Sequence, residues 1–113
     1  MLGTFDPAEG ALSDYQRWKA AARCLVYELP ETGCTIIVAT RALGKILKEG
    51  ITELRGAKVA RKARLLPIWR RDDVEKLNGL RGPVFVDPLI WLQGSREVVW
   101  AVSAAVATAR IIT

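Results

Sequence analysis

Two short apolar runs constrain the fold of this chain more than any other feature. They span residues 35–40 (Thr-Ile-Ile-Val-Ala-Thr) and 84–87 (Val-Phe-Val-Asp), and each stops abruptly at a polar residue. Runs of β-branched and aromatic residues without polar alternation are typical of strands buried on both faces of a parallel sheet. Ligands of such sheets bind outside the carboxyl ends of the strands, so Thr40, Arg41 and Asp87 mark the edge where a site is expected.

Apolar residues recur at helical spacing on either side of the first run. The first helix begins at Asp6-Pro7 or, by the stronger signal of a Ser-x-x-Gln capping box, at Ser13, and it ends near Tyr27. A second helix covers residues 41–54, where Gly50 either is tolerated or breaks the helix.

Residues 57–69 fit a helix or a strand, and we favour a strand over 63–69 because the apolar residues there leave no room for another helix. Pro67 cannot donate a ladder hydrogen bond, which predicts that this strand lies at an edge of the sheet or ends early. The remaining expectations are a short helix from Asp72 or Asp73 to about Asn78, a loop at 91–94, a buried helix from Ser95, and a short final strand at 110–113 as an option.

The alternation of helices and strands predicts one α/β domain over residues 1–113. We expect a small three-layer domain with a short, mainly parallel sheet of three or four strands, joined by right-handed crossovers. The apolar C-terminal run over 98–113 contains Ser103, Thr108 and Arg110 and is shorter than the ~20 residues that a membrane span needs. It therefore predicts a core helix of a soluble protein and no membrane partner.

The composition argues against most catalytic and metal-binding classes. The chain has no histidine and only two cysteines, so it lacks the commonest general base and the commonest metal ligand. The spacing of Cys24 and Cys34 fits no zinc pattern, and we expect two buried thiols in a reducing cytoplasm, with Cys24 serving packing. Residues 1–6 lack the basic start and apolar segment of a secretory leader. We expect no cofactor and favour a protein without enzyme activity.

Positive charge is concentrated in the middle of the chain. Ten of the Lys and Arg residues lie within 41–71 against two Glu, which gives that segment +8 within a total of +5 and leaves −3 for the rest. Such asymmetry predicts a face for phosphate groups or for an acidic protein; the alternative is a solvated helix and loop. Lys58, Arg61, Lys62 and Arg64 form its densest stretch, without interleaved aromatic residues for base stacking.

Four polar residues follow the expected strands. In a parallel sheet Arg41, Arg70, Arg71 and Asp87 converge on one edge, where three arginines and a carboxylate would suit a phosphate or carboxylate ligand. The alternative is internal pairing, of Arg41 with Asp87 and of the other two arginines with the acidic residues over 72–75.

Val84-Phe85-Val86-Asp87 resembles the strand of P-loop nucleotidases and helicases whose terminal carboxylate holds magnesium. Residues 35–40 with Arg41-Ala42-Leu43-Gly44 resemble the strand-to-helix junction of helicases. The chain lacks the Gly-Lys-Ser/Thr phosphate loop of that family, since Gly44-Lys45 is followed by Ile46. The resemblance implies Asp87 as a metal ligand; the alternative is that Asp87 caps the chain before Pro88. The run over 81–87 also resembles small phage-encoded viral proteins in style.

We therefore expect a non-catalytic basic module that binds nucleic acid or a phosphate-bearing ligand through the 41–71 face. The alternative is a protein-interaction, inhibitor or oligomeric module that uses the apolar C-terminal helix and an exposed tryptophan, including a homo-oligomer. We expect Trp18 to anchor the first helix, and Trp69, Trp91 and Trp100 to lie in the core or at its edge.

Overall fold

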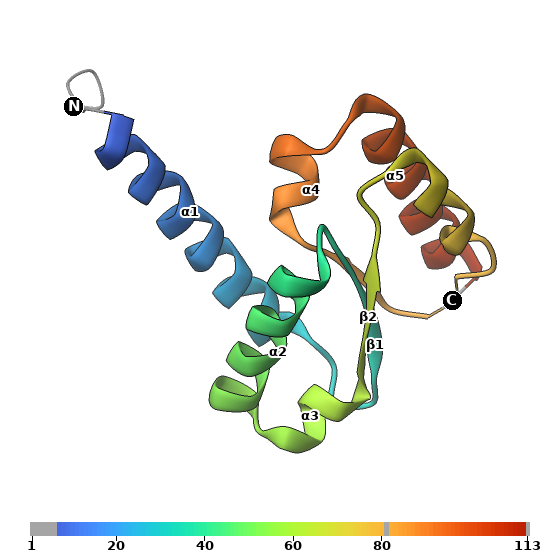
Figure 1. Ribbon diagram of the computed structural model, residues 1–113. Coiled ribbons are helices and arrows are strands. Elements are labelled where there is room, and N and C mark those ends of the chain that lie inside the picture. The colour runs from blue at the N-terminus through green and yellow to red at the C-terminus, as the bar shows by residue number, and fades with distance from the viewer. Residues whose placement is uncertain (1–6, 81, 113) are drawn as a thin grey trace.

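The computed structural model describes residues 7–80 and 82–112 of the chain (Figure 1). It is a small α/β domain with a three-stranded, all-parallel sheet, which confirms the predicted fold class. The elements in chain order are the helices and strands α1 (Pro7–Glu28), β1 (Cys34–Val38), α2 (Arg41–Arg55), α3 (Ala57–Lys62), β2 (Ala63–Pro67), the 3₁₀ helix η1 (Arg71–Leu77), β3 (Val84–Val86), α4 (Pro88–Gln93) and α5 (Arg96–Ile112).

The sheet has the order β2-β1-β3, with Ile36 of β1 opposite Leu65 of β2 and Phe85 of β3. The favoured strand at 63–69 and its edge position are thus confirmed. The Ile68 N–H donates to the Val38 carbonyl oxygen over 2.9 Å, and neighbouring residues of a parallel strand point their polar groups to opposite sides. Pro67 therefore faces away from β1, where its missing N–H costs no ladder hydrogen bond.

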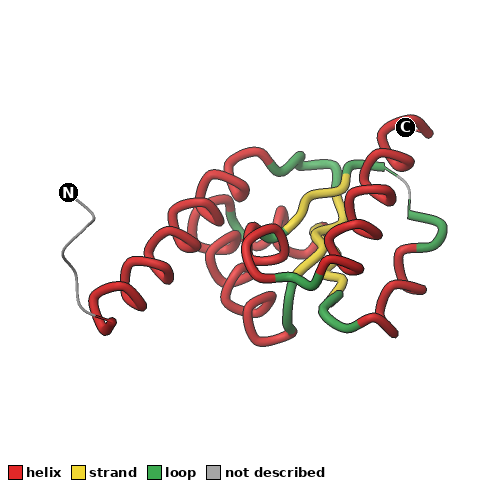
Figure 2. Tube along the Cα trace, turned by 90° about the horizontal axis from the view of Figure 1, so that it is seen from above, coloured by secondary structure: helices red, strands yellow, loops and turns green. Residues whose placement is uncertain are grey.

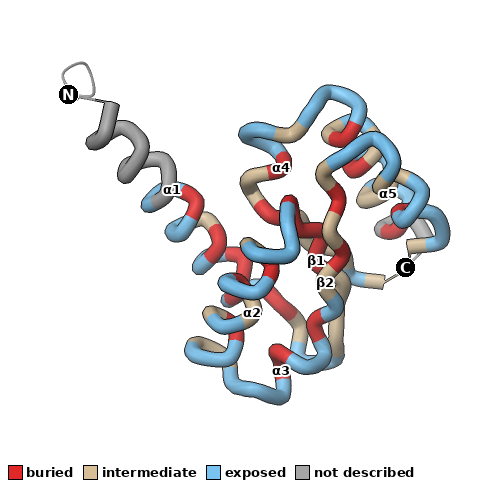
Figure 3. The backbone as a smooth tube through the Cα atoms, viewed as in Figure 1, coloured by how far each residue is buried: buried red, intermediate tan, exposed pale blue. Residues whose placement is uncertain are grey.

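The central strand separates two hydrophobic cores (Figure 3). Ile36 and Val38 pack with α1, α2 and α3, whereas Ile37 and Ala39 pack with η1, α4 and α5. Seen from above, helices lie on both sides of the strands (Figure 2). Successive side chains of a strand point to opposite faces, so a run that is apolar at every position is what a three-layer fold requires of its middle strand.

The ends of the first two long helices follow local signals. The described part of α1 begins at Pro7, so the start at Ser13 was wrong, and Asp6 of the other expected start lies outside the described residues. The Thr40 hydroxyl caps α2 by accepting a hydrogen bond from the Leu43 N–H over 3.1 Å. Gly50 is tolerated within α2, and Gly56, with φ at +94°, ends it.

Two later expectations were wrong, and the short helix expected after the second strand is present with a different helix type. Residues 91–94 are not all loop, because Asp87 and Pro88 start a helix that runs to Gln93. The last helix continues to Ile112 and replaces the optional strand, since apolar side chains along α5 pack on the sheet; Thr113 lies outside the described residues. The short helix near Asp72 and Asp73 is a 3₁₀ helix that begins at Arg71 and ends at Leu77.

Within the described ranges, no helix combines the length and the apolar character needed to cross a membrane.

Candidate nucleic-acid interface

The carboxyl ends of the three strands lie at one edge of the sheet, as the sequence predicted. Arg41 is the first residue of α2 after β1, Arg70 and Arg71 follow β2, and Asp87 follows β3. The three arginines are exposed, whereas Asp87 has an exposed fraction of only 1%. The four residues share an edge, but the carboxylate is turned into the protein and does not face solvent beside the guanidinium groups.

Three N–H groups hold the buried Asp87 carboxylate. The Trp18 indole N–H and the Leu89 backbone N–H donate to Oδ1 over 2.6 and 3.0 Å, and the Ala39 N–H donates to Oδ2 over 3.3 Å. Asp87 thus caps α4, as the alternative interpretation expected, and it also ties α1 to β1. Metal binding by Asp87 stays a prediction; over 7–80 and 82–112, no three His, Cys, Asp or Glu residues gather around a common point.

A groove of about 400 Å³ lies between α2 and the edge strand β2. Three cationic side chains line it, and they occupy positions i, i+4 and i+7 of α2, which share one helix face. Val38, Gly44, Leu65 and Pro67 form the rest of its lining, and the three cations are Arg41, Lys45 and Lys48. We call these three residues the groove cations.

The two carboxylates of α2 do not line this groove, although Glu49 follows Lys45 by one helical turn. Glu53 lines a different hollow, between α2 and α1, where it lies with Lys19 and Arg23. Glu49 precedes it by one turn and is exposed. The groove beside β2 is lined by the groove cations and, among the described residues, by no carboxylate. Its electrostatic potential is therefore positive, which attracts anions.

A second group of cations lies on α3. Lys58, Arg61 and Lys62 are exposed, while Val59 and Ala60 of the same helix are buried against the core. We call the three basic residues the α3 cations. α3 leads directly into β2 (Figure 1), so they stand at the amino end of the strand whose side the groove follows. Arg64 is exposed as well, but its neighbour Leu65 lines the groove, so Arg64 points to the other face of the sheet.

Two arginines of the 41–71 segment are engaged within the protein. Arg71 pairs with Glu97 of α5 over 3.3 Å, at an exposed position. Internal pairing is thus observed for Arg71, with a partner other than those expected at 72–75. Arg55 donates to the carbonyl oxygens of Val26 and Tyr27 over 3.0 and 3.1 Å, and it thereby caps the last turn of α1. The groove cations, the α3 cations, Arg64 and Arg70 form no ion pair within the described residues.

The structure thus groups the predicted site residues differently from the sequence. Lys45 and Lys48 join Arg41, although only Arg41 was expected at the site. Their spacing relative to Arg41 was the signal, but it indicates a shared helix face without showing that this face borders an open strand edge. The contact of Asp87 with Trp18 joins residues that are 69 positions apart, and no sequence pattern predicted it.

The aromatic and sulfur residues also required corrections. Trp18 is buried as expected, and Trp69 packs at the edge of one core. Trp91 and Trp100 are exposed, with fractions of 45% and 78%, so their assignment to the core was wrong. Cys24 is exposed rather than packed, because it lies on the outer side of α1. Cys34 is half-buried, and this burial raises the pKa of its thiol.

No family model, curated protein or solved structure matches this chain.

Proposed function

We propose that the chain binds the sugar-phosphate backbone of nucleic acid, with little sequence preference, along the groove between α2 and β2. The observation that carries this proposal is the groove lining: three cations on one helix face, without an ion pair to the described residues and without a carboxylate among the lining residues. Proteins neutralise most of their own surface charge by interspersing both signs. A one-signed groove is a feature that a polyanion can use.

The dimensions of the groove suit a phosphate chain. Arg41 and Lys48 are seven positions apart in α2, so their Cα atoms are separated by about 10 Å along the helix axis. One strand of a duplex carries a phosphate about every 3.4 Å of the duplex axis, so a groove of this length lying parallel to that axis faces about three phosphates of the strand. The α3 cations extend the positive surface beyond the groove, toward the amino end of β2.

The lining also indicates how selective binding would be. No aromatic side chain occurs among the residues that line this groove in the described part of the chain. Bases gain affinity mainly by stacking on aromatic side chains, so the phosphates are expected to supply the affinity. Such binding weakens steeply as the salt concentration rises, because it is driven by release of condensed counterions.

Charge reversal of the groove tests the proposal. We expect Lys45→Glu combined with Lys48→Glu to weaken binding of a labelled 20-nucleotide DNA at least tenfold in fluorescence anisotropy, at about 50 mM salt. The matched control is Arg17→Glu combined with Arg96→Glu, which changes the net charge equally at exposed positions of α1 and α5. Equal losses in both double variants would show that net charge alone drives binding, and they would refute a site in the groove.

A further inference from the structure

The second inference concerns the opposite edge of the sheet and goes beyond the proposed function. We propose that the outer edge of β3 binds an extended peptide segment of a partner protein as a fourth strand. The segment would carry a Lys or Arg between two apolar residues. The proposal uses none of the basic residues of the α2–β2 groove, so either can fail without the other.

The outer side of β3 offers backbone groups for strand addition. Its inner side is identified by two hydrogen bonds: the Thr35 N–H donates to the Pro83 carbonyl oxygen over 3.0 Å, and the Asp87 N–H donates to the Ile37 carbonyl oxygen over 2.7 Å. Residues 83, 85 and 87 thus face β1, and the alternation of a parallel strand turns the N–H and C=O groups of Val84 and Val86 outward. β3 is an edge strand of the described sheet.

The two edges of the sheet differ in this respect. On β2 the outward position next to the strand end is Pro67, which has no N–H to offer. On β3 the proline is Pro83, and it occupies a position that faces inward. β3 therefore offers an N–H donor at both of its outward positions, Val84 and Val86, whereas β2 keeps one at Leu65 and lacks one at Pro67.

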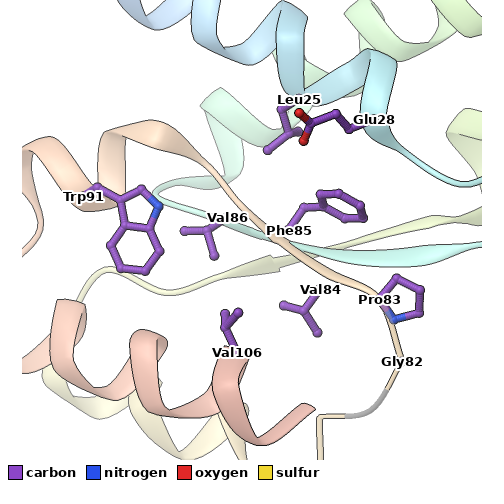
Figure 4. Close-up of a pocket in the computed structure, with 9 residues that line it drawn as sticks. All are labelled: Leu25, Glu28, Gly82, Pro83, Val84, Phe85, Val86, Trp91 and Val106. Atoms are coloured by element: carbon purple, nitrogen blue, oxygen red, sulfur yellow. The ribbon is translucent and has the colours of Figure 1, made fainter. Parts of the chain in front are cut away.

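A groove of about 600 Å³ follows the outer side of β3 (Figure 4). One wall, below the strand in the figure, consists of Val84, Val86, Val106 and Trp91. The other wall, above the strand, consists of Phe85 with Leu25 and Glu28 of α1. The exposure of Trp91 is explained by this position, because its ring borders an open apolar groove rather than the core. Aromatic side chains at such positions are typical anchors for protein partners.

The two walls specify the chemistry of the occupant. Side chains of an added strand alternate between the walls, so every second residue meets the valines and Trp91 and the residues between them meet Leu25 and Glu28. Glu28 is exposed, forms no ion pair within the described residues, and is the only carboxylate among the residues that line this groove. An apolar–basic–apolar segment therefore satisfies both walls, and β-strand addition supplies the backbone hydrogen bonds.

A second copy of the chain is a poorer occupant. Pairing of β3 with its own copy about a twofold axis at Phe85 would leave both α1 helices on the same face of the joined sheet. The two Glu28 carboxylates would then lie on that face together, where they repel each other. The charge of the groove favours a basic peptide over self-association.

Alternate N-methylation of a probe peptide tests the geometry without altering the protein. The probe is a fluorophore-labelled Gly-Thr-Val-Lys-Val-Thr-Gly peptide, and we expect saturable binding below about 1 mM. N-methylation of the two valines removes donors on one side of the peptide strand, and N-methylation of the lysine and the second threonine removes donors on the other. One modification should abolish binding and the other should leave it within twofold; equal effects of both, or no binding of the parent peptide, would overturn the proposal.

Charge exchange tests the assigned wall. Glu28→Lys should weaken binding of the lysine probe about fivefold and strengthen binding of a probe that carries Glu in place of the lysine. The matched control Glu31→Lys reverses an exposed charge in the turn after α1, outside the groove, and should change neither affinity. Equal changes in probe affinity for the two variants would overturn the assignment. A second overturning result would be a protein dimer in sedimentation, with the Val84 and Val86 amides protected from hydrogen exchange in the absence of peptide.

Discussion

We expect removal of the hydrogen bond between Trp18 and Asp87 to lower the free energy of unfolding strongly. The indole N–H donates to a carboxylate that is 99% buried, over 2.6 Å, and it joins α1 to the end of β3. Trp18→Phe keeps an aromatic ring in the core but removes this donor. Asp87 Oδ1 then keeps only the hydrogen bond from the Leu89 N–H, and a hydrogen bond to a charged group contributes about 1.5–3 kcal/mol.

The expected loss of stability follows from two contributions. We assign about 2 kcal/mol to the lost hydrogen bond and about 1 kcal/mol to the space that the smaller ring leaves unfilled. The sum of about 3 kcal/mol is a large part of the 5–15 kcal/mol that is typical of a domain. With an unfolding entropy of about 2.1 cal/mol/K per residue, it lowers the melting temperature by roughly 12 °C.

Urea and thermal unfolding followed by circular dichroism measure this loss. The matched control is Trp100→Phe, because Trp100 is 78% exposed and its replacement should change stability by less than about 0.5 kcal/mol. Combination of Trp18→Phe with Asp87→Asn in a double-mutant cycle should give a coupling energy of about 1.5 kcal/mol. A Trp18→Phe variant as stable as the Trp100→Phe variant would refute the reasoning.

Two further predictions concern stability. The backbone N–H groups of Arg70 and Trp69 lower the pKa of Asp73 from 3.8 to about 2, so the ionised side chain stabilises the fold above pH 4 and this contribution is lost as the pH falls from about 4 to about 2. Asp73→Asn should lower the free energy of unfolding by about 1 kcal/mol at pH 7, after allowance for solvent screening. The stability of this variant should also depend less on pH between about 4 and 2. If the variant and the unmodified protein lost stability equally over that range, the prediction would be contradicted. Gly50→Ala should stabilise α2 by about 0.8 kcal/mol, because a methyl group there meets no atom within 4 Å. Gly94→Ala should destabilise the protein, because its Cβ would collide with the Ile90 carbonyl oxygen. Urea unfolding in which both substitutions changed stability in the same direction would contradict the local geometry.

The sequence predicted the elements whose signals are local and the sheet that their order requires. Residues 35–40 indicated a doubly buried strand, and Pro67 indicated an edge, because each pattern reflects a constraint on the backbone or on both faces of a strand. The missed helix after Asp87 follows the same Asp-Pro pattern that the sequence has at residues 6–7, a pattern that the expectation of a loop at 91–94 did not use. Local signals compete, and only packing decides between them.

The site was less predictable than the fold. Trp91 and Trp100 were expected in the core or at its edge, yet α5 turns only one stripe of its surface toward the sheet and α4 ends beside an open edge. The partners of Asp87 depend on where α1 crosses the strand ends. The groove cations share a helix face that the sequence can predict, and Pro67 predicted the strand edge, but no residue pattern showed that this helix face and this edge lie side by side.

The measurement that tests the central claim most directly is the salt dependence of nucleic-acid binding by the unmodified protein. Single- and double-stranded DNA and RNA of several sequences would be titrated in fluorescence anisotropy between about 50 and 200 mM salt. A phosphate-binding groove predicts affinities that differ little between sequences and fall steeply with salt, with a logarithmic slope that shrinks by about 1 for each groove cation removed. Absence of binding at 50 mM salt, or binding that salt does not weaken, would contradict the account.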